Sequence, residues 1–166
     1  MYKFRGIITA LLGILLLCLP PARFGCAVYA GIPIFAAAFF LRVCARMHIG
    51  EHTREKELSC PSLAQTGPYK YIRHPLYLSN FMAGAAFVLF HAGFSLGALG
   101  FCTVYGMFLA ALAYKENKFF ISCPTSNTVH IKQSVVKSII NDRYTWIWQA
   151  VVLVIIFLLK IEGVNF

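Results

Sequence analysis

Residues 67–90 read GPYKYIRHPLYLSNFMAGAAFVLF, a polar turn followed by a long apolar run. The opening Gly-Pro dipeptide is typical of a turn. Pro75 has no backbone N–H and disfavours the α conformation at His74, so a helix is predicted to begin at about Leu76. The apolar run to about Phe90 approaches the ~20 residues that a helix needs to cross a bilayer. This stretch therefore predicts a polar loop that leads directly into a transmembrane helix.

Four more apolar segments lie along the chain, at residues 4–19, 24–43, 94–114 and 146–159. Hydrophobic residues make up 59% of the chain, charged residues make up 13%, and the mean hydropathy is +0.70. A soluble domain averages about 45–50% apolar and about 25% charged residues, so this composition excludes a water-soluble protein. We expect an all-α fold, an integral membrane bundle of about five transmembrane helices at 4–19, 24–43, 76–90, 94–114 and 146–159, in a single domain over residues 1–166. A signal peptide is the alternative for the first segment, but no convincing small-residue cleavage site precedes Arg23.

The charged residues and the cysteines exclude two other classes of protein. The chain carries 15 Lys and Arg against six Asp and Glu, a net charge of +9. The basic residues cluster between the apolar runs, which indicates lipid headgroups rather than nucleic acid as their partner. The six cysteines form no CxxC pair and no zinc-ligand spacing, so no disulfide framework is predicted.

The basic residues also predict the orientation in the membrane. With five spans, 13 of the 15 Lys and Arg fall on one side, and only Arg23 and Lys160 fall on the other. The positive-inside rule then predicts a multi-pass protein with a cytoplasmic N-terminus and an outside C-terminus. A reporter fused after Phe166 tests this prediction, because a strong cytoplasmic signal from it would contradict the five-span arrangement.

Two polar segments, residues 44–75 and 115–145, are predicted to lie in the cytoplasm. Both are much longer than the usual connection of about 4–6 residues, and loops of this length often carry function. Because the two segments emerge on the same side of the membrane, they are able to meet and form one site.

The candidate site residues gather just before the helix that begins near Leu76. Arg73 and His74 would lie at a helix N-terminus, where unpaired backbone N–H groups favour an anionic group. Tyr69, Tyr71 and Tyr77 add aromatic walls and hydroxyl donors. The pattern predicts a pocket for an anionic, aromatic ligand. The alternative is an interfacial anchor, because Tyr, Lys and Arg are common at headgroup depth.

Residues 67–78 also resemble the signature of the isoprenylcysteine carboxyl methyltransferase and phospholipid methyltransferase superfamily, which usually reads Gly-Pro-Tyr-x-x-x-Arg-His-Pro-x-Tyr-x-Gly. Members are membrane-embedded, use S-adenosylmethionine, and line their cofactor pocket with the signature residues. The resemblance covers roughly residues 50–120. It implies cofactor contacts at Leu63, Ala64, Tyr69, Arg73, His74, Pro75, Leu76 and Tyr77.

A second element of the family is a Glu-Glu pair at the cytoplasmic end of the helix that follows the hairpin. Glu116 matches the first Glu, and a carboxylate there suits the ammonium group of the cofactor. Asn117 stands in place of the second Glu, and Ser79 replaces the last Gly of the signature. Leu112 stands where isoprenylcysteine members have an Arg that contacts the substrate carboxylate. The resemblance therefore supports cofactor binding better than it identifies the acceptor.

The function that the resemblance implies is S-adenosylmethionine-dependent methyl transfer to a lipid or lipidated acceptor from the bilayer, most like a prenylcysteine carboxylate. A phospholipid or lipid-phosphate acceptor is the alternative within this class, and an inactive membrane scaffold is the alternative of another class. Arg73 and His74 are expected to act in catalysis by orienting anionic groups, and Glu116 to hold the cofactor amine. An anionic acceptor needs alignment rather than a base, whereas an amine acceptor would need a base such as His74 or His52.

A zinc site is the alternative hypothesis for the polar stretch at residues 48–52. His48-Ile-Gly-Glu-His52 fits the H-x-x-E-H pattern of some zinc proteases, and Glu116 is a conceivable third ligand. Gly50, however, weakens a helix by about 1 kcal/mol, and so short a pattern arises easily by chance. We therefore expect no metal site.

Overall fold

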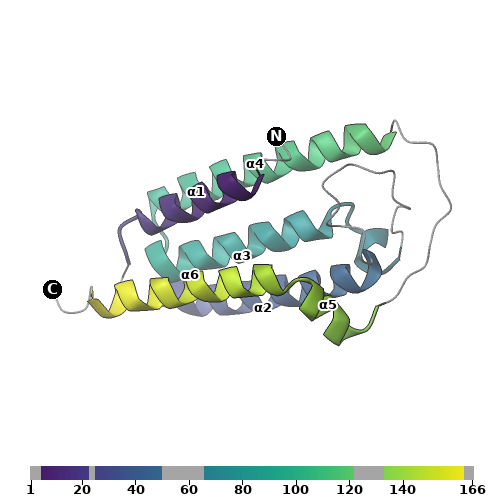
Figure 1. The fold of residues 1–166 in the computed structure, drawn as a ribbon. Coiled ribbons are helices and arrows are strands. Elements are labelled where there is room, and N and C mark those ends of the chain that lie inside the picture. The colour runs from purple at the N-terminus through teal and green to yellow at the C-terminus, as the bar shows by residue number, and fades with distance from the viewer. Residues whose placement is uncertain (1–4, 23–24, 50–65, 122–132, 163–166) are drawn as a thin grey trace.

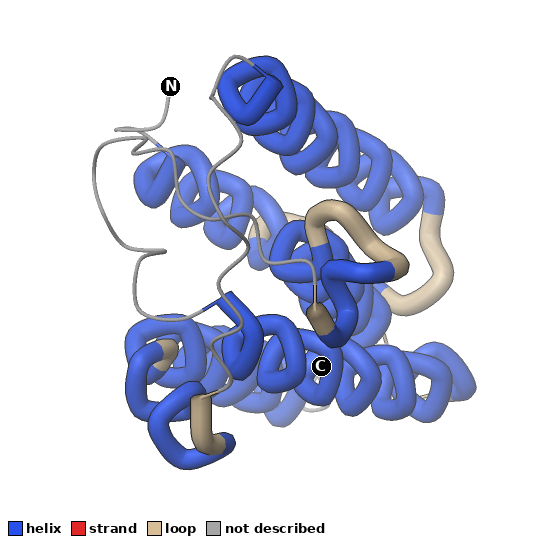
Figure 2. Tube along the Cα trace, turned by 90° about the vertical axis from the view of Figure 1, so that its right-hand side faces the viewer, coloured by secondary structure: helices blue, strands red, loops and turns tan. Residues whose placement is uncertain are grey.

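All regular structure in the described part of the chain is helical (Figure 1 and Figure 2). The structure is a computed structural model that describes residues 5–22, 25–49, 66–121 and 133–162. Its elements are α1 (Arg5–Leu17), α2 (Cys26–Ile49), the short 3₁₀ helix η3 (Gly67–Lys70), α3 (Pro75–Ala92), α4 (Leu96–Ile121), α5 (Val135–Asn141) and α6 (Arg143–Glu162). The prediction of an all-α fold is confirmed.

Four of these helices are long and apolar enough to cross a membrane. The candidate spans are Cys26–His48, Pro75–Ala92, Leu96–Lys118 and Arg143–Ile161. Large apolar side chains on their outer faces are exposed, and Phe40 on α2 is 71% exposed. Exposed apolar faces of this kind are stable in lipid but not in water. The chain is therefore an integral membrane helical bundle.

The first expected span is shorter than the other four. Helix α1 has 13 residues, so it is about 20 Å long at 1.5 Å per residue. The hydrocarbon core of a bilayer is about 30 Å thick. In the described residues, α1 therefore falls short of a full span, whereas the expected helix covered residues 4–19.

Three helices extend at least three residues beyond their expected ends. Helix α2 continues past residue 43 to Ile49, α4 continues past residue 114 to Ile121, and α6 begins at Arg143 rather than at residue 146. Hydropathy detects only the apolar part of a helix. Lys, Arg and Glu are good helix formers, so the backbone stays helical where the polar residues begin. These extensions place Arg46 and Glu116 on helices rather than in loops.

Helix α3 lies at the centre of the bundle. It contacts α1, α2, α4 and α6, and Figure 1 shows it between α4 and the pair formed by α2 and α6. The small residues Ser79, Ala83 and Ala86 of α3 are buried, which allows neighbouring helices to approach closely. Leu16, Phe87, Val88, Val152 and Ile156 contribute to the core cluster that joins α3 to α1 and α6.

The polar ends of the helices meet at one end of the bundle, as the sequence predicted. The backbone N–H of Gln133, just before α5, donates to the carbonyl oxygen of Met47 in α2 over 2.8 Å. The turn that starts η3 packs equally closely on α2. Gly67 has φ of +60°, and a Cβ added there would lie 2.5 Å from Cε1 of His48. Only glycine fits this conformation and this close approach, so Gly67 fixes the path into α3.

Candidate functional site

A pocket of about 660 Å³ lies inside the bundle, and residues of α1, α2, η3, α3, α4 and α6 line it. Its volume falls in the range of about 300–1,000 Å³ that is usual for small-molecule sites. Because α3 and α4 are antiparallel neighbours, His74 and Glu116 share one end of the pocket. Phe87 and Phe101 line it about three to four turns further into the bundle. The pocket therefore joins a polar end to an apolar interior.

The polar end is organised around His74, the residue just before α3. Its Nδ1 lies 3.3 Å from Oε2 of Glu116, and its Nε2 lies 2.9 Å from Oδ1 of Asn117. Both partners are oxygen acceptors, so both ring nitrogens donate, and this arrangement fits the charged imidazolium. The hydrogen bond to Glu116 is the largest influence and raises the pKa of His74, although partial burial opposes it.

The raised pKa of His74 predicts a pH dependence of stability. A histidine whose pKa is higher in the folded chain than in the unfolded chain stabilises the fold. This contribution is complete at pH values below 6.5, the ordinary pKa of histidine, and it is lost as the pH rises through the pKa of the folded chain. The unfolding temperature of the detergent-solubilised chain should therefore fall as the pH is raised above the ordinary histidine pKa of 6.5. In Glu116→Gln the curve should be flatter over the same range. Parallel curves for the two proteins would show that the pair does not stabilise the fold.

Tyr69 of η3 supplies a second polar group at this end. Its hydroxyl is buried and has no hydrogen-bond partner among the described residues. Burial raises the pKa of Tyr69 well above its ordinary value, and the opposing charge of Arg46 does not offset this. The hydroxyl therefore stays protonated. An unsatisfied buried donor is costly, so a bound ligand that accepts its hydrogen bond would remove that cost.

Only some of the other predicted site residues line the pocket. Pro75, Leu76 and Tyr77 line the pocket together with Tyr69, His74 and Glu116. Arg73 is exposed and is not part of the lining, although its charge acts on His74. Tyr71 is 82% exposed. Leu63 and Ala64 lie outside the described residues, as do Glu51 and His52 of the rival zinc pattern.

The three departures from the family pattern take clear structural roles. Asn117 keeps an oxygen acceptor on His74, so the loss of a carboxylate there preserves the hydrogen bond. The Ser79 hydroxyl donates to the carbonyl oxygen of Leu76 over 2.9 Å, which satisfies it inside the bundle. Leu112 is 3% exposed and lines the pocket one turn before Glu116. It provides an apolar wall where an Arg was the family expectation.

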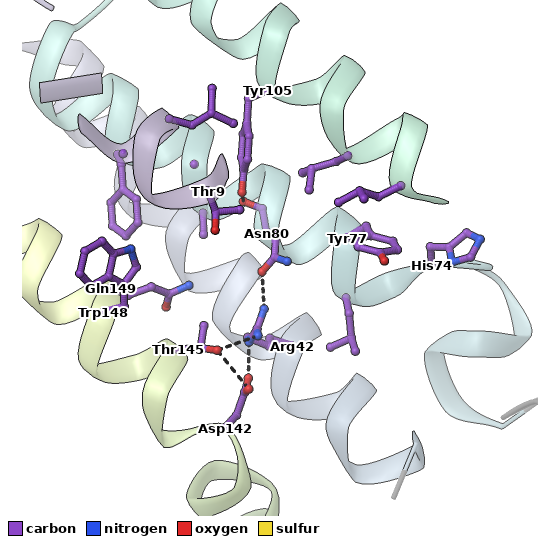
Figure 3. A pocket seen from close by; sticks show the side chains of 18 of the residues that line it. Thr9, Arg42, His74, Tyr77, Asn80, Tyr105, Asp142, Thr145, Trp148 and Gln149 are labelled. Carbon is purple, nitrogen blue, oxygen red and sulfur yellow. Dashed lines mark hydrogen bonds and ion pairs between the residues drawn. The ribbon is translucent and has the colours of Figure 1, made fainter. Parts of the chain in front are cut away.

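Sequence reasoning missed a buried polar network in the pocket wall. Arg42 and Arg46 belong to the basic residues that the charge pattern places at the membrane surface, but they are only 7% and 9% exposed. Arg42 donates through Nε to Asp142 Oδ2, through Nη1 to Asn80 Oδ1, and through Nη2 to Thr145 Oγ1 over 3.1 Å. Figure 3 shows these three bonds converging on Arg42 between Asn80 and Asp142.

Asp142 joins both guanidinium groups of this network. Nη2 of Arg46 donates to its Oδ1 over 2.8 Å. Burial alone would raise the pKa of Asp142, but hydrogen bonds and charge from Arg42 and Arg46 hold it below the ordinary value. Two signals were present in the sequence: Asp142 is the only Asp in the chain, and Arg42 and Arg46 are four residues apart, so they share a helix face.

One family model matches this chain. The model of the Isoprenylcysteine carboxyl methyltransferase (ICMT) family matches residues 29–122. The matched region runs from α2 through α4 and contains His74, Glu116 and Arg42. No curated protein and no solved structure matches the chain. Asp142, Thr145 and the rest of α6 line the same pocket from outside the matched region.

Proposed function

Because the chain belongs to the isoprenylcysteine carboxyl methyltransferase family, we propose that it transfers a methyl group from S-adenosylmethionine to a lipid or lipidated acceptor in the membrane. The family and the four apolar helices support a membrane methyltransferase. The observation that carries the finer proposal is the continuous pocket, since one end offers polar groups for a cofactor and the interior offers apolar walls for a lipid chain.

The polar end fits S-adenosylmethionine by its chemistry. Glu116 offers a carboxylate to the ammonium group of the cofactor, and Tyr69 offers an unsatisfied buried hydroxyl. Pro75, Leu76 and Tyr77 provide apolar and aromatic walls, and we propose that Leu63 and Ala64 add to them. Glu116 and Tyr69 would hold the cofactor at this end of the pocket, where it would supply an electrophilic methyl group to an acceptor oxygen.

The state of His74 favours an anionic acceptor over an amine. Both ring nitrogens face oxygen acceptors, and the pKa of His74 is raised. A histidine whose two ring nitrogens both donate to oxygen acceptors has no free lone pair with which to remove a proton from an amine. A carboxylate or phosphate needs no deprotonation, only alignment and exclusion of water. We therefore propose that His74 positions Glu116 and does not act as a base, and that Arg73 attracts anionic groups from the exposed rim.

Methyl transfer from labelled S-adenosylmethionine tests the proposal directly. Membranes that contain the chain should incorporate label, and membranes with His74→Ala should not. Base-labile label would identify a carboxylate ester, and base-stable label in the lipid extract would identify a phospholipid amine or a lipid phosphate. If no label is transferred and the purified chain does not bind the cofactor, the proposal is wrong and the chain is an inactive scaffold. The proposed cytoplasmic N-terminus would give the polar end access to cytoplasmic cofactor.

Filling the apolar interior of the pocket should block the acceptor but not the cofactor. Gly13 of α1 lines the pocket, and a Cβ added there meets no atom within 4 Å. The indole of Gly13→Trp would occupy the space proposed for the lipid chain. The KM for the acceptor should rise by about tenfold or more, with an unchanged Kd for S-adenosylmethionine.

Gly100→Trp is the matched control for this variant. Gly100 also lies in an apolar helix with no atom within 4 Å of an added Cβ, but it is exposed and lies outside the pocket lining. Its acceptor KM should match that of the unmodified chain. Equal KM values for the two Trp variants would place the acceptor elsewhere.

A further inference from the structure

We propose that Arg42 and Asn80 form an anion-binding subsite that recognises the negatively charged headgroup of the acceptor. The inference rests on the proposed function for the lipid nature of the acceptor, and it adds the residues that select the headgroup. Arg42 lies on α2 and Asn80 on α3, and both line the pocket between its polar end and its apolar interior. Figure 3 shows Arg42 and Asn80 between His74 on one side and Gln149 on the other.

The geometry fixes the guanidinium of Arg42 in one position. Its three hydrogen bonds end on α3, α6 and Asp142, so separate parts of the fold hold it. The ring of Trp146 lies against it, with its centroid 5.8 Å from Cζ. An ionisable side chain inside a membrane-spanning helix is expensive and is therefore a functional candidate. A guanidinium held in this way is already oriented for a ligand and loses little freedom on binding.

The groups that remain available are hydrogen-bond donors. Three of the five N–H groups of Arg42 are used, and the other two have no hydrogen-bond partner within the described ranges. The Asn80 amide oxygen accepts from Arg42, so its NH₂ group is left to face the pocket, again without a hydrogen-bond partner in the described structure. Arg42 and Arg46 share the carboxylate of Asp142, and a site that offers donors beside these two guanidinium groups selects a carboxylate or a phosphate over a neutral group.

Binding of charged and neutral lipid pairs tests this subsite without any methyl transfer. The first pair is N-acetyl-S-farnesylcysteine and its methyl ester, and the second is dioleoyl phosphatidic acid and dioleoylglycerol. The purified full chain should bind the anionic member of one pair about 10- to 100-fold more tightly, the range that a charge-assisted hydrogen bond contributes. The pair that shows the preference distinguishes a carboxylate from a phosphate. Equal affinities within both pairs would overturn the proposal.

The double variant Arg42→Gln/Asp142→Asn separates recognition from structure. It removes the cation together with the negative charge that balances it, and the amide oxygen of the new Asn keeps an acceptor for Arg46, which also bonds to Asp142. The preference for the anionic lipid should fall to within about twofold, while the affinities for the neutral lipid and for S-adenosylmethionine stay unchanged. A retained preference would show that Arg42 is purely structural. Arg143→Gln, which removes an exposed charge one residue along, should keep the full preference.

A second variant keeps the test decisive if the double variant does not fold. Asn80→Leu leaves the ion pair of Arg42 and Asp142 intact and removes one donor, so the anionic lipid should bind several-fold more weakly. An unchanged affinity would overturn the proposed role of Asn80. Methyl transfer is measured separately: an anion preference without transfer would refute the proposed function alone, and transfer without a preference would refute the subsite alone.

Discussion

Asp142→Ala is expected to lower the free energy of unfolding by about 3–5 kcal/mol, the usual cost of removing one partner from a buried ion pair. The Asp142 side chain is 1% exposed and accepts hydrogen bonds from Arg42, Arg46 and Thr145. Without it, the guanidinium of Arg42 stays buried and loses the carboxylate that balances it. The substitution should also loosen the junction of α5 and α6, since Asp142 connects that junction to α2.

Unfolding of the purified chain in detergent measures this effect, and Arg143→Ala is its control. Arg143 is the next residue and is exposed, so its loss should change stability by less than about 0.5 kcal/mol. The lowered pKa of Asp142 predicts a pH dependence of stability. The ionised carboxylate stabilises the fold at pH values above 3.8, the ordinary pKa of Asp, and this contribution is lost as the pH falls through the pKa of the folded chain. Unfolding at a series of acidic pH values measures this loss. Equal stability of Asp142→Ala and Arg143→Ala would refute a stabilising network.

Glu116→Gln should weaken the binding of S-adenosylmethionine by about 10- to 100-fold, because it replaces a charge-assisted hydrogen bond by a neutral one. The side chain keeps its size, so the pocket keeps its shape. Glu116 also holds His74 through Nδ1, and the loss of its charge lowers the imidazolium fraction. His74→Ala should also weaken the binding of S-adenosylmethionine, because Glu116 loses the side chain that holds it in place.

Equilibrium dialysis with labelled cofactor measures the affinity directly, without an acceptor. Lys118→Gln is a suitable control, because it removes a charge from an exposed position of the same helix two residues further on. Its Kd for the cofactor should equal that of the unmodified chain. An unchanged Kd in Glu116→Gln would exclude this carboxylate from the cofactor site, whereas a weaker Kd with an intact fold would support the assignment.

Much of the fold followed from local features of the sequence. The apolar runs predicted α2, α3, α4 and α6. In lipid, backbone N–H and C=O groups must bond to each other, and a helix satisfies all of them within one segment. Pro75 marked the start of α3 correctly, since proline is favoured in the first turn. The ends of α2 and α4 were placed too early, because hydropathy falls where polar residues begin although the helix continues. Helix α1 has 13 residues, whereas a helix over residues 4–19 was expected. Here the apolar run is longer than the helix.

The candidate site was predicted only where its residues are neighbours in sequence. Tyr69, His74, Pro75 and Tyr77 lie within a few residues of each other, so a motif reveals them. Arg42 and Asp142 are 100 residues apart, and no local sequence pattern predicts that α6 packs beside α2. The charge pattern alone placed Arg42 at the membrane surface and gave no indication of a role for Asp142.

By itself, the sequence determined that this chain is a membrane helix bundle with a methyltransferase-type motif next to α3, because composition and short motifs are local properties. Only the tertiary structure decided which charges are buried, that Asn117 still accepts a hydrogen bond from His74, and that α6 completes the pocket. These facts depend on the contacts of helices distant in sequence. The energy of a charge depends on what surrounds it, and that is set only when the helices have packed.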